Sequence, residues 1–181
     1  MKTNQILLLA LISIGFISCK MTGETNYTPH ISISSRLRVF KPDLLNRIDT
    51  LDIYNTTVAG ELLLDTISVG DTVEIPITLD GITNNITALY LVQSADSLTS
   101  VILPAKSSLD ALFSASSNYA QGKFISNLSF TSLYFPFRYI ARKPSNVAKL
   151  SFSVVSDAVF KDLSGSNTNS FVLRTPIKAA K

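Results

Sequence analysis

The sequence predicts an all-β fold, a single domain built as an antiparallel two-sheet sandwich with at most one short helix. Apolar and polar residues alternate at period two in several segments, as expected of strands with one buried and one solvent-facing side. Turn residues separate these segments at short intervals, which favours a sandwich over a barrel or an α/β fold. The chain has a single cysteine, so no disulfide framework supports the fold.

The first 18 residues have the pattern of an export signal. Lys2 precedes an apolar run from Ile6 to Ile17 that only Ser13 and Gly15 interrupt. The run is too short for a permanent membrane-spanning helix, and a charged start followed by a short apolar stretch and a small residue is typical of signal peptides. We therefore expect residues 1–18 to be removed as a leader.

The end of this leader, Phe16-Ile17-Ser18-Cys19, resembles the lipobox of bacterial lipoproteins. The resemblance implies that Cys19 is acylated and becomes the first residue of the mature protein. Each buried methylene of an acyl chain contributes about 0.8 kcal/mol, so several chains hold a protein firmly to a membrane. The alternative is an ordinary signal peptide that happens to contain a cysteine.

Residues 19–29 form the predicted lipidated cysteine and flexible tether, because they are polar, contain Gly23 and show no apolar period. Residues 30–181 form the predicted domain, and the roughly 160 residues after the leader suffice for one hydrophobic core. The formal charge is +3 for the full chain and +2 without Lys2. Because the basic residues are scattered, we expect no nucleic-acid partner.

The predicted strands are the segments with alternation or with β-branched and aromatic residues. In chain order they lie at residues 31–39, 51–54, 61–67, 73–79, 86–93, 99–103, 124–140, 150–154 and 171–177. The turn signals between them are Gly70-Asp71, Asp80-Gly81, Asn84-Asn85, Gly122-Lys123, Lys143-Pro144 and Gly165.

Two local features refine this pattern. The one helical candidate is Ser108–Ser114, where Ser107 or Ser108 would cap the first turn, although a loop between strands also fits. Pro76 has no amide hydrogen, so we expect its strand to lie at a sheet edge or the proline to occupy a bulge.

The residues offer little for catalysis or for metal binding. His30 is the only histidine, and no nucleophile elbow accompanies it, so a serine triad is not expected. Zinc would need thiols or further imidazoles, and the short aspartate-containing turns offer only a fragment of a calcium loop. We see no phosphate loop and no dinucleotide motif. The sequence therefore predicts a protein that is not an enzyme, with no catalytic residue, no metal and no cofactor.

The densest aromatic stretch suggests a ligand surface. If residues 133–140 are extended, Leu133, Phe135, Phe137 and Tyr139 share the core side, while Tyr134 and Arg138 share the other. A tyrosine and an arginine that face solvent are typical of surfaces that bind a sugar or a peptide. The chain lacks tryptophan, which is the usual flat platform for sugar rings. The alternative is an exposed tyrosine packed by the arginine stem.

Four triplets consist of Asp, then Ser or Thr, then an aliphatic residue, and they place Thr50, Thr66, Thr72 and Ser97 at the middle position. They resemble the O-glycosylation sequon of the Bacteroidota periplasm, which makes these four residues candidate glycosylation sites. From the composition, chance predicts roughly one match. The competing explanation is that a turn aspartate followed by a β-branched residue is a common way for a strand to begin.

The leader, the Ser/Thr/Asn-rich strands, these triplets and the segment 149–157 together resemble the small cell-envelope lipoproteins of the Bacteroidota. The resemblance implies an immunoglobulin-like sandwich and a non-enzymatic binding or accessory module for an envelope protein or a glycan. One alternative is a structural or adhesin-like subunit that assembles through an exposed strand edge. Another is a hydrolase, which would need a concave site with two carboxylates.

Localisation follows from the residue after the lipidated cysteine. Lys20 replaces the aspartate that retains many lipoproteins at the inner membrane, so the resemblance implies the outer membrane. The acidic tag for surface export is largely missing, because only Glu24 follows. We therefore expect the protein to face the periplasm.

Overall fold

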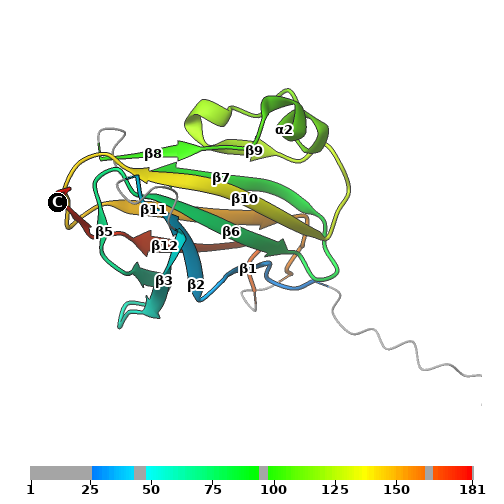
Figure 1. Ribbon diagram of the computed structural model, residues 1–181. Helices are drawn as coiled ribbons and strands as arrows, with labels where there is room; N and C mark the ends of the chain where they lie inside the picture. The colour runs from blue at the N-terminus through cyan, green and yellow to red at the C-terminus, as the bar shows by residue number, and fades with distance from the viewer. Residues whose placement is uncertain (1–25, 43–47, 94–97, 162–164, 181) are drawn as a thin grey trace, which may run out of the picture.

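The computed structural model describes residues 26–42, 48–93, 98–161 and 165–180, and these form a mostly β protein. They contain one α-helix, α2 (Lys106–Leu112), and one 3-10 turn, η1 (Tyr119–Gln121) (Figure 1). The prediction of an all-β chain with at most one short helix is confirmed at this level. The strands are β1 (His30–Ile33), β2 (Arg36–Phe40), β3 (Ile48–Asn55), β4 (Glu61–Leu64), β5 (Ile67–Ser68), β6 (Thr72–Asp80), β7 (Ile86–Gln93), β8 (Thr99–Ile102), β9 (Lys123–Ile125), β10 (Ser132–Ala141), β11 (Lys149–Ser156), β12 (Thr168–Arg174) and β13 (Ile177–Lys178).

Alternation in the sequence decides which side of each strand is buried. In β6 every second residue is buried, from Val73 to Leu79, while the residues between them are half-buried. In β10 the predicted core residues Leu133, Phe135 and Tyr139 are buried as expected. The period of two in the chain thus becomes the inner and outer face of the sheet.

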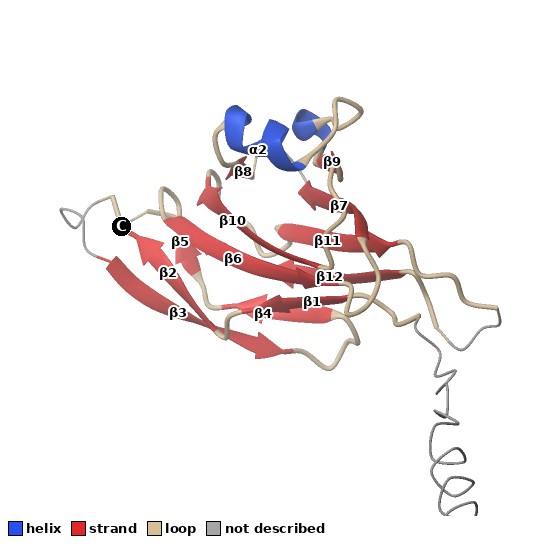
Figure 2. Cartoon of the chain, turned by 90° about the vertical axis from the view of Figure 1, so that its right-hand side faces the viewer, coloured by secondary structure: helices blue, strands red, loops and turns tan. Residues whose placement is uncertain are grey.

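Most strands join one curled sheet in the order β8-β10-β6-β2-β3-β4-β12-β11-β7-β9, with β1 also paired to β6. Strand β3 makes the corner, because Ile48–Asp52 pair with β2 and residues 53–55 pair with β4. The prediction has two separate sheets, whereas β3 here connects both halves. Figure 2 shows that α2 lies above the two end strands of the curled sheet, β8 and β9.

One hydrophobic core fills the space inside the curl. Phe135 of β10 lies 5.3 Å from the ring centroid of Phe124 in β9, and Phe137 lies 5.7 Å from that of Phe152 in β11. These rings belong to opposite halves of the sheet and are all buried. Burying one such side chain contributes roughly 1.5–3 kcal/mol, so the contacts hold the halves together.

Pro76 does not lie on an edge strand, so that alternative is wrong, whereas the pairing beside it is irregular as the bulge alternative expects: Ile33 pairs with Ile77 and Arg38 with Glu74, so four residues lie opposite two. Strand β6 has β10 on one side and both β1 and β2 on the other. Pro76 lies opposite Pro136 of β10 and between the segments that pair with β1 and β2. A proline is tolerated at this position because the neighbouring strand is interrupted at residues 34–35. The sheet has no hydrogen bond there that would need the amide hydrogen that proline lacks.

The helix begins earlier than the sequence predicts. Its N-cap is Ala105, without a side-chain hydrogen bond, so neither Ser107 nor Ser108 is the cap. Lys106 Nζ donates to Asp110 Oδ2 one turn later, and this pair stabilises a first turn that already contains the two serines. Leu109 is the helix residue that is buried against the core.

Residues 26–28 of the predicted tether are hydrogen-bonded to the loops of the domain. Asn26 Oδ1 accepts hydrogen bonds from Asn84 Nδ2 and from Val159 N, both at 3.2 Å. Tyr27 N donates to Asn84 Oδ1 at 3.1 Å, and Ser166 N donates to the hydroxyl of Thr28 at 3.1 Å. The remaining tether residues, including Cys19, and the leader 1–18 lie outside the described residues.

Candidate functional site

A groove opens where the two ends of the curled sheet approach each other beneath the connection from α2 to β9. Its volume is about 620 Å³, within the range of small-ligand and peptide sites. The lining combines aliphatic and aromatic side chains with two amides and includes no charged side chain among the described residues. The lining residues are Leu91, Val92, Gln93, Val101, Leu103, Tyr119, Ala120, Gln121, Gly122 and Phe124.

Backbone geometry at Gly122 forms one wall of the groove. Gly122 has φ +66°, and a Cβ atom there would lie 1.7 Å from the carbonyl oxygen of Leu91. Only glycine fits, because the turn must approach β7 closely enough for Leu91 N to donate to the carbonyl of Gly122 at 2.8 Å. Asn118 fixes the same turn by accepting a hydrogen bond from Gln121 N at 3.2 Å. Gln121 is thereby held at the rim.

Polar contacts from α2 position the tyrosine of the groove. Tyr119 Oη donates to Asp110 Oδ1 at 3.1 Å, and Lys106 holds the other carboxylate oxygen. Desolvation raises the pKa of Tyr119, and the hydrogen bond to Asp110 adds to this shift. The hydrogen bond from Lys106 lowers the pKa of Asp110. Tyr119 is therefore a neutral phenol over the physiological range, with its ring directed along the groove wall, 5.5 Å from that of Phe124.

Strand edges border the groove on two sides. Among the described residues, β8 pairs with β10 only, so its other edge carries no ladder partner. Beyond Tyr90, the end of β7 pairs with β11 but no longer with β9. The hydroxyl of Thr99 donates to Gln93 Oε1 at 3.2 Å and closes the groove at the loop between β7 and β8. The free edge of β8 therefore offers backbone donors and acceptors beside apolar side chains, whereas Leu91 N of β7 is already bonded to the carbonyl of Gly122.

The predicted ligand residues Tyr134 and Arg138 lie elsewhere, on the outer face of β10. Both are exposed, but Pro136 lies between them, and four residues of strand separate their backbones by roughly 13 Å. Arg138 Cζ lies 5.3 Å from the ring centroid of Phe40 in β2, so its cationic head packs on phenylalanine and not on the tyrosine. A shallow pocket of about 320 Å³ includes Arg138 but not Tyr134. The structure places the two residues on one face without bringing them together.

Of the four candidate glycosylation sites, Ser97 lies outside the described residues. Thr50 is exposed within β3, Thr66 is exposed in the link between β4 and β5, and Thr72 is half-buried with strands on both sides. The side chains of the aspartates before these threonines accept hydrogen bonds from backbone N–H groups. Asp49 accepts from Thr50 N at 2.9 Å, Asp65 accepts from Asp52 N at 3.2 Å, and Asp71 accepts from Ser68 N at 2.9 Å.

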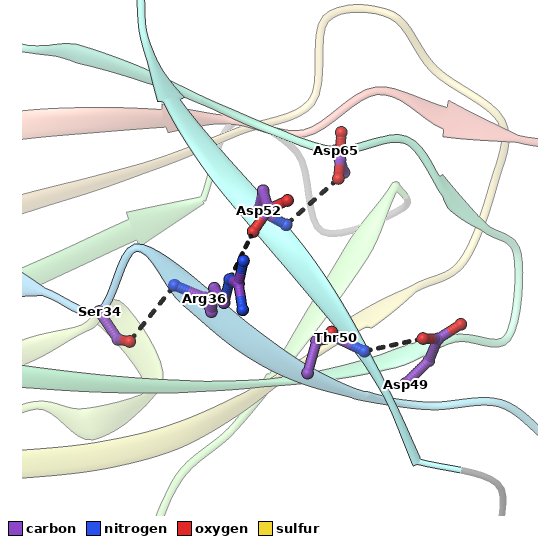
Figure 3. A network of polar contacts seen from close by, with 6 residues as sticks. All are labelled: Ser34, Arg36, Asp49, Thr50, Asp52 and Asp65. Atoms are coloured by element: carbon purple, nitrogen blue, oxygen red, sulfur yellow. Dashed lines mark hydrogen bonds and ion pairs between the residues drawn. The ribbon is translucent and has the colours of Figure 1, made fainter.

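Figure 3 shows two of these aspartates, Asp49 and Asp65, on the surface around β2, β3 and β4, together with their neighbour Asp52. The carboxylate of Asp52 forms an ion pair with Arg36 Nε at 3.2 Å. The backbone nitrogen of Asp52 donates a hydrogen bond to Asp65 Oδ2. Just before β2, Ser34 Oγ accepts a hydrogen bond from Arg36 N at 3.3 Å. These contacts give the aspartates a local structural role, as the turn explanation of the triplets expects.

Residues suited to metal binding do not gather in the described part of the chain. His30 is exposed at the start of β1, where its register partner is Asp80. No group of three or more His, Cys, Asp or Glu side chains is placed to hold a metal ion among residues 26–42, 48–93, 98–161 and 165–180. Within the same residues, no helix has the length and apolarity needed to cross a bilayer.

Comparison with known proteins adds similarity at the level of structure, and it is distant. No family model and no curated protein sequence matches the chain. Among solved structures, the chain is similar to the ASH/PapD-like domain 7 of human CEP192, with a TM-score of 0.40 and 11% sequence identity. The match covers 91% of this chain and 95% of that chain.

Sequence reasoning missed the groove. Gln93, Tyr119 and Gln121 belong to separate segments that meet only through the long-range pairing of the sheet. The one local signal was Gly122-Lys123, which the sequence marks as a turn. A glycine there was compatible with an ordinary turn, and nothing in the residue pattern indicated its close approach to Leu91.

Proposed function

We propose that the protein is an outer-membrane lipoprotein that faces the periplasm and acts as a non-enzymatic binding module for an extended protein segment. The leader and the lipobox-like residues before Cys19 support the anchor. The groove between the free edge of β8 and the end of β7 carries the binding proposal. An extended peptide presents backbone donors and acceptors along its length, which is the complement that an unpaired strand edge accepts.

The same proposal describes the curled sheet as an immunoglobulin-like fold with two packed layers. Ring contacts between β10 and strands β9 and β11 support it, because they link strands at opposite ends of the hydrogen-bonded path. In this reading β3 forms the closed corner of the sandwich, and the groove is the opposite corner, where β8 and β9 are not paired. Ligand binding would then complete a sandwich that is open along one side.

The groove chemistry favours a neutral peptide over a charged one. Its side chains include Gln93, Gln121 and Tyr119, which exchange hydrogen bonds without bearing charge near neutral pH. Buried charge from a ligand would find no ionic partner in this lining, and its desolvation would oppose binding. We therefore expect alternating apolar and small polar side chains in the bound segment.

The second candidate is a glycan site on the outer face of the sheet. The specific observation in its favour is that Arg38 and Arg138 both lie over Phe40, with Cζ-to-centroid distances of 5.8 and 5.3 Å. Glu74 pairs with Arg38 at 3.6 Å beside the shallow pocket. Charged and aromatic groups on one open face suit an acidic sugar better than a neutral peptide.

Binding is tested on the mature lipidated protein in detergent, with a display library of short random peptides and an array of oligosaccharides. Ala120 is exposed and lines the groove, so Ala120→Trp fills the groove at little cost to folding. The matched control is Ala111→Trp, on an exposed position of α2 outside the lining. We expect selected peptides to bind at least about tenfold more weakly to Ala120→Trp, a loss of about 1.4 kcal/mol, and equally well to the control.

Two outcomes contradict the peptide proposal. If sugars bind, and Phe40→Ala weakens them while Ala120→Trp does not, the outer face is the ligand site. If neither library yields a binder that Ala120→Trp affects, the groove is not a binding site. The anchor is tested separately by growth in labelled palmitate, since Cys19→Ala should abolish labelling if the lipobox is functional.

A further inference from the structure

Four exposed apolar side chains occupy the end of the domain at which the described chain begins. They are Tyr27, Ile82, Leu128 and Val159, with exposed fractions of 46, 48, 52 and 69%. We call this region the tether end; it consists of residues 26–29, 80–86, 126–131 and 157–160. In Figure 1 it lies on the right, away from the C-terminus and close to the β6–β7 turn.

Hydrogen bonds join these segments into one surface. Gly81 N donates to the carbonyl of Thr131 at 2.7 Å, and Ile86 N donates to that of Phe130 at 2.9 Å. On the other side of the same turn, Asn85 N donates to Asp157 Oδ1 at 2.7 Å. Asn26 connects to both Asn84 and Val159. The four apolar side chains therefore belong to loops that hold one another in place.

Ile82 carries an independent sign of function. Its φ of +63° is left-handed, a conformation that a β-branched residue rarely adopts. Ile82 N donates to Asp80 Oδ1 at 2.7 Å, which holds the residue at the tip of the turn with its side chain exposed. A glycine or an asparagine would fit this backbone with less strain, so the aliphatic side chain is present at a local steric cost.

The charges at the tether end do not favour an electrostatic partner. Asp80 and Asp157 accept hydrogen bonds from backbone groups of the β6–β7 turn. Among the described residues within these segments or directly next to them in the chain, the basic ones are His30 and Lys161, and both are exposed. With two carboxylates opposing them, the surface has no net positive cluster to attract anionic headgroups. The apolar side chains are thus the feature that a partner would recognise.

The chain length limits the distance between this surface and the anchor. Residues 20–25 separate Cys19 from Asn26, and a segment of that length spans at most roughly 25 Å when fully extended. Because Asn26 and Tyr27 are bound to the domain, the connection cannot lengthen without breaking their hydrogen bonds. A lipid on Cys19 would therefore hold the tether end near the bilayer surface.

We propose that the tether end lies against the bilayer, with Tyr27, Ile82, Leu128 and Val159 inserted into the interfacial region of zwitterionic lipid. This inference rests on the proposed lipidation of Cys19. Aromatic and aliphatic side chains on a short-tethered surface gain contact area with lipid, while the anchor removes most of the entropic cost of association. Strand β7 runs from this end towards Gln93, so the contact directs the groove away from the membrane.

The test uses a matched pair of valines in the mature lipidated protein, reconstituted into phosphatidylethanolamine vesicles. The chain has no tryptophan, so Val159→Trp and Val147→Trp each introduce a single tryptophan, which can be excited selectively over the tyrosines. The two valines are 69 and 66% exposed, and Val147 belongs to the loop near β13, away from the tether end. We expect a blue shift and quenching by brominated lipid for Val159→Trp alone, unchanged at high salt.

The result separates the two proposals. Vesicle flotation and palmitate labelling report the anchor, and both should be lost in Cys19→Ala. If the protein floats but both tryptophans keep the emission that they show in detergent without lipid quenching, the membrane contact is refuted and the anchor stands. If the protein neither floats nor takes up label, the anchor proposal fails and this inference falls with it. Equal quenching at both positions would also refute a contact confined to the tether end.

Discussion

At the scale of single residues, the core contains a hydroxyl in an unusual setting. Tyr139 is completely buried in β10, and its Oη lies near the hydroxyls of Thr175 and Thr99 without satisfying hydrogen-bond geometry with either. Burial raises the pKa of this tyrosine above its usual value. A buried donor without a partner costs roughly 1–3 kcal/mol, which a phenylalanine of nearly the same shape would avoid.

We expect Tyr139→Phe to raise the free energy of unfolding by about 1 kcal/mol. The pH dependence should also change. Because the pKa in the folded state is higher than in the unfolded state, the unfolded chain loses its proton first as the pH rises. The wild type therefore loses stability above about pH 10, and the variant should lose less. Urea unfolding at pH 8 and pH 11 measures both effects, and equal slopes for the two proteins would refute the explanation.

Strain at Ile82 leads to a second residue-scale prediction. Ile82→Asn should raise the free energy of unfolding by about 1 kcal/mol, because asparagine adopts the left-handed conformation more easily. If the tether end contacts lipid, the same change should reduce the quenching of Val159→Trp in vesicles. Thermal unfolding and fluorescence measure the two quantities. A loss of stability would show that the isoleucine is held by packing and not against strain.

The exposed threonines separate the two explanations of the Asp-Ser/Thr triplets. Thr66 lies in an exposed link, whereas Thr72 is half-buried between two paired strands. If the triplets are glycosylated, we expect Thr66→Ala to remove one sugar addition and Thr72→Ala to remove none, because an enzyme reaches a link more easily than an interior strand. Intact-mass analysis from the native host decides this. An unmodified wild-type mass leaves the turn role of the aspartates as the explanation.

At the scale of elements, the helix shows how a short segment can form with a poor start. Ala105 has the extended backbone of an N-cap, with φ −55° and ψ 141°, but it offers no side-chain acceptor. We expect Ala105→Ser to stabilise the protein by about 1 kcal/mol. The control is Ala115→Ser, which lies exposed beyond the helix and should have no effect. Denaturant unfolding measures both, and equal effects would show that capping is not the cause.

Strands were predictable from the sequence where one side of the segment is uniformly apolar. The faces of β6 and β10 follow directly from alternation, since a shift by one residue would expose every core side chain. Partners of those strands were not predictable, because pairing depends on which distant segments meet. The position of Pro76 illustrates this: its missing donor was recognised, but the break at residues 34–35 that accommodates it appears only once β1 and β2 are known to share β6.

The predicted site residues show the same distinction between what local alternation determines and what strand pairing determines. Tyr134 and Arg138 were correctly assigned to the outer face, because facing follows from the local period. Their separation and the packing of Arg138 on Phe40 depend on the neighbouring strand β2. The groove is a product of the whole curl, so no local pattern contained it.

At the scale of the whole molecule, the sheet is built from pairings between distant segments. Strand β1 pairs with β6, β4 with β12, and β7 with β11. Loop closure must precede such contacts, so folding is slow in proteins of this kind. We expect refolding of the mature chain on a millisecond-to-second scale, measured by stopped-flow tyrosine fluorescence. Refolding in microseconds would mean that a local nucleus governs folding.

The first and last described residues lie at opposite ends of the domain, as Figure 1 shows. If the tether end is anchored at a bilayer as proposed above, a partner domain fused behind β13 would stand a full strand length away from the lipid headgroups, with the curled sheet between them as a spacer. Such an arrangement suits the chain for use as a display scaffold: cargo appended at the carboxyl end would project into the aqueous compartment without competing for the anchor.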